Sequence, residues 1–111
     1  MRLGQLNRRV VIERPDDSDG TAGGQVRVWK VVARAMVRAV PVGGSEALVA
    51  GTLHASTPWR IDMRFADVRV TDRLRGDWIA ATKQIGIRSV EDPDGRRHRL
   101  VLLGETEPLE A

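Results

Sequence analysis

Apolar and polar residues alternate along most of the chain, and a period of two is typical of a β-strand with one buried and one solvated face. The clearest case is residues 58–65. One face would carry Trp59, Ile61, Met63 and Phe65, and the other Arg60, Asp62 and Arg64. Residues 26–40 alternate in the same way from Trp29 onward, but Val26 and Val28 have the opposite parity. This change of parity predicts a bulge near Trp29.

Shorter alternating segments lie at both ends of the chain. Val10 and Ile12 predict the buried face of a short first strand that Pro15 ends. Asp92-Pro93-Asp94-Gly95 is a strong turn sequence, because proline presets φ and glycine accepts a positive φ. Further strands are expected around Leu74 with Trp78–Ala80, over Ile85–Val90 and over Arg99–Leu103, with the register of residues 74–88 left open.

Three segments break the alternation. Residues 16–24 are polar and glycine-rich, which predicts a mobile hairpin loop, and residues 104–111 are expected to be a loose tail. Residues 41–56 form an insertion in which Ser45 can cap a short helix over Glu46–Leu53. We therefore predict a single domain over residues 1–111, mainly all-β. It would be a small antiparallel barrel or sandwich of about six strands, with one short helix between the second and third strands.

Composition limits the core and the cellular setting. The 111 residues suffice for one domain, and three Trp, one Phe and no Tyr leave most of the core to aliphatic side chains. A core this thin would gain from pairing with neighbouring copies. The absence of Cys excludes disulfides and thiolate metal sites. The first residues lack the apolar run of a signal peptide, and no segment approaches a membrane span, so we expect a soluble protein with no membrane partner.

Basic residues slightly exceed acidic ones, 18 against 15, and all but Lys30 and Lys83 are arginine. Two interpretations are open: codon usage in a GC-rich genome, or arginines selected for interface ion pairs and phosphate contacts. The densest basic block is Arg96-Arg97-His98-Arg99. Arg96, Arg97 and Arg99 are therefore a candidate basic contact, with an exposed hairpin flank as the alternative. Aromatic residues do not interleave with this block, so it does not indicate a base-stacking platform.

Candidate reactive groups are few. Gly43-Gly44-Ser45-Glu46-Ala47 loosely resembles a nucleophile elbow, but that motif belongs to a larger parallel sheet, and Ser45 also suits a helix cap. Asp17-Ser18-Asp19-Gly20 resembles part of a calcium loop whose first and last ligand positions here hold Pro15 and Val26. Two isolated histidines, His54 and His98, do not make a metal site. We expect no enzyme activity, no metal and no cofactor.

The order of these features resembles the phage head-tail joining family, also called head closure, stopper or adaptor proteins. The similar segments are Leu6–Pro15, Trp29 with Val37–Pro41, Gly44-Ser45-Glu46, Thr57–Phe65, Asp72-Arg73, Ser89–Arg97 and Leu100–Leu103. Residues 80–84 depart from the family's pattern. The resemblance implies a ring of six or twelve copies in the neck of a phage, prophage-derived particle or gene transfer agent. The protein would be made in the bacterial cytoplasm.

The resemblance also implies partners and roles for particular segments. The ring would lie between a portal or adaptor ring and the tail terminator or tail tube, and would hold packaged double-stranded DNA without sequence preference. The insertion would be the channel gate, with the alternative that it only covers one barrel end. Its candidate residues are Gly43, Gly44, Ser45, Glu46, Leu48, Gly51, Leu53 and His54. Candidates for contact between rings are Asp17, Asp19, Gly20, Gly23 and Gly24. The rival interpretation is a free nucleic-acid-binding barrel of the OB type.

Overall fold

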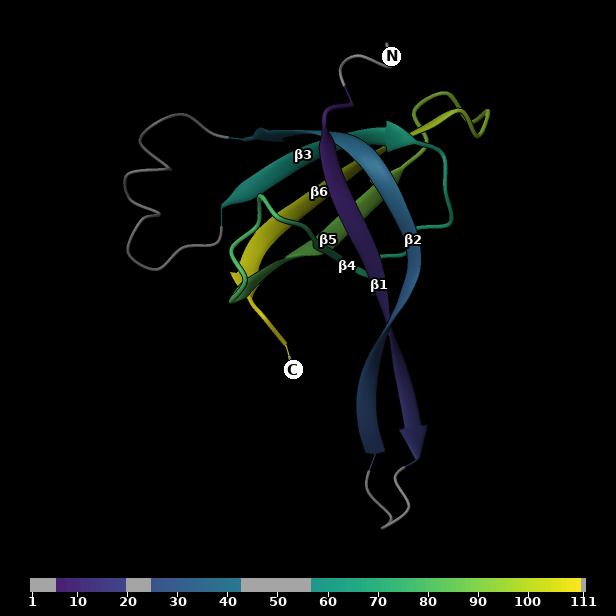
Figure 1. The fold of residues 1–111 in the computed structure, drawn as a ribbon. Coiled ribbons are helices and arrows are strands. Elements are labelled where there is room, and N and C mark those ends of the chain that lie inside the picture. The colour runs from purple at the N-terminus through teal and green to yellow at the C-terminus, as the bar shows by residue number, and fades with distance from the viewer. Residues whose placement is uncertain (1–5, 20–24, 43–56, 111) are drawn as a thin grey trace.

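The computed structural model describes residues 6–19, 25–42 and 57–110, and this part of the chain is all-β (Figure 1). Its six strands are β1 (Arg8–Asp19), β2 (Gln25–Pro41), β3 (Pro58–Arg64), β4 (Arg73–Arg75), β5 (Lys83–Glu91) and β6 (Arg99–Pro108). All pairings are antiparallel, and the strands close into a barrel in the order β1-β2-β3-β6-β5-β4. The predicted small antiparallel barrel is confirmed. The predicted helix at residues 46–53 lies outside the described residues.

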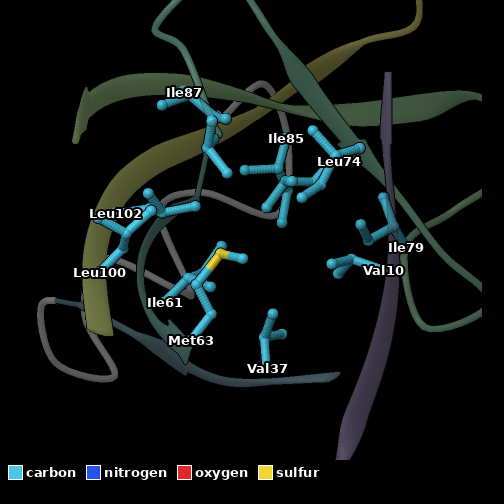
Figure 2. Packing of buried hydrophobic residues seen from close by; sticks show 12 residues of the cluster. Val10, Val37, Ile61, Met63, Leu74, Ile79, Ile85, Ile87, Leu100 and Leu102 are labelled. Atoms are coloured by element: carbon cyan, nitrogen blue, oxygen red, sulfur yellow. The ribbon is translucent and has the colours of Figure 1, made fainter. Parts of the chain in front are cut away.

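Alternation along the strands places aliphatic side chains inside the barrel, where they point toward one another (Figure 2). Every strand contributes to this core, from Val10 and Ile12 in β1 to Leu100 and Leu102 in β6. Six of its side chains have no exposed surface: Ile12, Val37, Ile61, Leu74, Ile85 and Leu102. Burial of one such side chain is worth roughly 1.5–3 kcal/mol, which is enough to fix the inward parity of each strand.

The hairpin of β1 and β2 is longer than the sequence predicts. Pro15 does not end β1, because it stands opposite Trp29 within a ladder that runs on to Asp19 opposite Gln25. Proline is tolerated there because an outer strand edge needs no N–H donor on its free side. Residues 16–19 are therefore strand, and the mobile-loop prediction was wrong for them. Residues 20–24 lie outside the described part.

The bulge lies three residues beyond the predicted position. Ile12 pairs with Ala33 and Glu13 pairs with Val31, so Val32 is the extra residue. Beyond it, residues 14–19 and 25–31 form a two-stranded ribbon that projects from the barrel, and we call this ribbon the arm (Figure 1). Among the described residues, the strand pairings of the arm are between β1 and β2 alone.

The C-terminal half differs from the prediction in two places. Residues 104–108 are not a loose tail, since they belong to β6 and pair with β5. Trp78–Ala80 is not a strand, because Trp78 turns to pack edge-to-face on Trp59, with ring centroids 5.5 Å apart. Its indole N–H donates to the carbonyl oxygen of Arg9 at 2.8 Å. This packing leaves β4 only three residues long.

Candidate functional site

The arm projects from the barrel (Figure 1), and ion pairs fasten its root, which is the end where it joins the barrel. Arg14 of β1 donates Nε and Nη2 to the two carboxylate oxygens of Asp72 at 2.8 and 2.9 Å. Asp72 is 2% exposed and also accepts the backbone N–H of Arg69 at 2.9 Å. The hydrogen bonds that Arg14 donates to Asp72 are the main reason that the pKa of Arg14 is raised. This fork ties the arm to the connection between β3 and β4.

A second cluster fastens the arm from the other face. Arg73 of β4 is 6% exposed, and its guanidinium lies 3.9 Å from the centre of the Trp29 ring in β2. It donates Nε to Glu13 of β1 and Nη1 to Gln84 of β5, each at 2.8 Å. A buried arginine is stable only when its charge and its donors are satisfied, and these partners satisfy them. One side chain thus joins four strands at the root of the arm.

Gln84 extends the cluster toward the C-terminal strand. Its Nε2 donates to Glu107 of β6 at 2.8 Å, and Arg88 donates to the other carboxylate oxygen of Glu107 at 2.8 Å. Burial acts to raise the pKa of Glu107. The hydrogen bonds from Arg88 and Gln84, with the charge of Arg88, outweigh that effect, so the pKa lies below its ordinary value. The residues after Leu103 are therefore part of the support of the arm.

The candidate basic contact lies on the turn between β5 and β6. Arg97 has a left-handed backbone with φ of 58°, and its N–H donates to Oδ2 of Asp92 at 2.9 Å. Its guanidinium stands 6.0 Å from the centre of the Phe65 ring, while Arg99 pairs with Asp94 at 3.5 Å. Arg96 and Arg97 are exposed. The turn therefore presents its charges from a fixed loop, and its role as a contact remains a prediction.

Two surface hollows flank Phe65, which is 41% exposed. One, of about 370 Å³, lies between β2 and the end of β3 and is lined by Met36 and Met63 among others. The other, of about 430 Å³, includes Val68 and Leu100 in its lining. Open, partly apolar hollows of this kind suit contact with another protein better than enclosure of a small molecule.

The other candidates fall partly outside the described residues. Asp17 and Asp19 are in β1, and the glycines at 20, 23 and 24 are not described. The proposed gate residues, from Gly43 to His54, lie in the segment 43–56 and are also not described. No group of His, Asp and Glu suited to a metal ion occurs within residues 6–19, 25–42 and 57–110. Within the same ranges, no helix is long and apolar enough to cross a membrane.

Sequence reasoning missed the two clusters at the root of the arm. It noted Asp72-Arg73 only as a pair similar to the head-tail joining family. Arg73 meets Glu13 and Trp29 through pairings between strands that are distant in the chain. The available signal was the isolated Asp-Arg pair beside a short apolar segment, where burial of charge is rare unless it is paired.

Comparison with known proteins decides the family. The model of the phage head completion protein family matches residues 1–107, nearly the whole chain. The chain belongs to the phage head completion protein family. This result confirms the resemblance to phage head-tail proteins and identifies a structural component of a phage or phage-like particle. No curated protein matches the chain.

Two solved structures share the fold of this head completion protein. Protein SF1141 from Shigella flexneri 2a, a solution structure, has a TM-score of 0.67 and 23% identity, covering 95% of this chain and 96% of that one. A chain of the virion of a native gene transfer agent particle has a TM-score of 0.65 and 23% identity, covering 96% and 97%. At this identity the similarity shows the fold alone.

Proposed function

We propose that this chain is a ring-forming subunit of the neck of a tailed phage or phage-like particle. Copies would form a ring of six or twelve below the portal or adaptor ring, close the filled head, retain the double-stranded DNA and dock the tail. The observation that carries the proposal is membership of the head completion family across residues 1–107. A chain of the same fold in the virion of a gene transfer agent supports it.

The anchored arm is well suited to contact between copies. A closed ring repeats one heterologous contact, so each copy must present that contact at the same angle. The Arg14–Asp72 fork and the buried Arg73 hold the arm in one direction relative to the barrel. Val28 and Val31 of the arm are 44% and 45% exposed, and a neighbouring copy would remove them from water.

The insertion after β2 is the proposed gate. Its two ends lie together at the barrel, because the N–H of Val42 donates to the carbonyl oxygen of Pro58 at 2.9 Å. The N–H of Thr106 donates to the carbonyl oxygen of Thr57, also at 2.9 Å. A segment held at a closed base can change shape without disturbing the barrel, as a gate requires. The alternative role, covering one barrel end, needs the same base.

Electron microscopy of the purified chain and of particles that contain it tests the proposal. We expect rings of the pure protein, and neck density that is lost when the chain is deleted. Val31→Glu should weaken ring formation because it places a charge in the proposed contact. Val70→Glu is the matched control, since Val70 is 56% exposed in the connection between β3 and β4. A chain that stays monomeric, or deletion particles that keep their DNA and tails, would contradict the proposal.

A further inference from the structure

Five arginines share the outer face of three neighbouring strands. They are Arg34 and Arg38 of β2, Arg60 and Arg64 of β3, and Arg99 of β6. Strand register sets them side by side, because Arg38 stands opposite Asp62 and Arg64 stands opposite Arg99. We call these five residues the arginine face. It lies on the opposite side of the barrel from β4, which is three strands away from β3 in either direction.

The charges of the arginine face are only partly neutralised. Asp62 is 6% exposed and lies between Arg38, at 3.5 Å, and Arg60, at 3.4 Å. Arg34 and Arg64 pair with no carboxylate among the described residues. A buried carboxylate shared by two half-exposed guanidinium groups fixes their positions while leaving most of their N–H donors free. The face therefore presents a fixed excess of positive charge.

Several carboxylates of the described residues are engaged in ion pairs on other faces and do not neutralise the arginine face. Asp67 and Asp72 pair with Arg14, Glu13 pairs with Arg73, and Glu107 pairs with Arg88. The surplus positive charge of Arg34 and Arg64 is complementary to an external polyanion, and the acidic residues of a second copy are the alternative that the test must separate.

We propose that the arginine face binds the phosphate backbone of double-stranded DNA. This inference rests on the proposed function, in which the subunit surrounds a DNA-filled channel. Arginine suits the partner because its planar fork meets phosphate oxygens with two donors at once. Contacts to phosphates carry no sequence information, which is the property needed to hold whatever DNA has been packaged. The turn arginines Arg96 and Arg97 would extend the same surface.

Salt-dependent binding of the purified full chain to a mixed-sequence duplex tests this assignment. Each phosphate contact steepens the fall of log affinity with log salt by about 0.9. The double variant Arg34→Gln/Arg64→Gln removes two charges that have no ion pair, so we expect the slope to become shallower by about 1.8. The control Arg9→Gln/Arg75→Gln removes the same charge from β1 and β4 and should keep the original slope. The variant Arg34→Lys/Arg64→Lys keeps both charges and should therefore keep most of the wild-type slope.

The outcomes separate this inference from the proposed function. The assignment is overturned if the wild-type chain does not bind duplex DNA at low salt, or if both double variants change the slope equally. It is also overturned if the face variant loses ring assembly while its DNA binding is unchanged, which would make the face a protein interface. A last outcome is that rings never form, while only the arginine-face variant shows a shallower salt dependence of DNA affinity. In that case the DNA-binding surface stands and the proposed neck ring fails.

Discussion

At the scale of single residues, Asp72 shows how one short side chain can hold two segments. Its carboxylate accepts the Arg14 fork and the Arg69 N–H, so all three donors depend on one buried group. The side chain of Asp72 has no exposed surface, whereas that of Arg14 keeps 20%. Loss of the carboxylate charge would leave the Arg14 guanidinium without its buried counter-ion.

We predict that Asp72→Asn lowers the free energy of unfolding by about 2–4 kcal/mol, because it breaks a buried, charge-assisted pair and leaves one partner behind. Urea unfolding measures the effect. Asp94→Asn is the matched control, since its pair with Arg99 is exposed and should contribute less than about 1 kcal/mol. Equal effects of the two substitutions would show that the fork does not anchor the arm.

Glu107 makes the free energy of unfolding depend on pH in the acidic range. Its pKa in the folded chain lies below the ordinary 4.5, so its contribution to stability is complete above that pH and is lost as the pH falls through the folded value. From about pH 6 to about pH 3, Glu107→Gln should therefore lose less free energy of unfolding than the wild-type chain. Urea titrations across this range measure it. If the free energy of unfolding falls with pH equally in the variant and in the wild-type chain, the Glu107 carboxylate does not have this role.

At the scale of elements, the arm takes its direction from strands that lie beside it but far along the chain. Arg73 belongs to the shortest strand, yet it contacts β1, β2 and β5. A two-stranded ribbon alone is only marginally stable in water. The cluster around Arg73 is therefore what makes the arm a defined element.

Arg73→Gln should release the arm while the far side of the barrel stays intact. We expect about 2–3 kcal/mol of destabilisation and faster hydrogen exchange at residues 28–31, with little change in β3. Arg60→Gln serves as the control, because its side chain is 52% exposed on β3 and its loss should cost little. Unchanged exchange in the arm would mean that Trp29 and the ladder hold it without Arg73.

At the scale of the whole molecule, alternation was enough to predict the barrel and the core-facing part of most strands, because inward parity is fixed by burial. Alternation could not show which outward residues become neighbours. Asp62 lies on the polar face of β3 as predicted, yet it is buried, because Arg38 of β2 and Arg60 cover it. Likewise, β1 continues past Pro15 because β2 supplies the partner, which a local turn signal cannot reveal. The order of segments along the chain was enough to predict the family. The ion-pair clusters at the root of the arm could be found only from the fold, because their residues are distant in the chain.

The unpaired borders of the arm also bear on how the protein behaves before assembly. Pro15 lacks an N–H, Lys30 forms an ion pair with Asp16, and the extra residue Val32 shifts the register where the arm joins the barrel. Each of these features discourages open-ended strand addition, the route to fibrils. The arm can therefore expose its two strand edges to solvent without templating open-ended strand addition between copies.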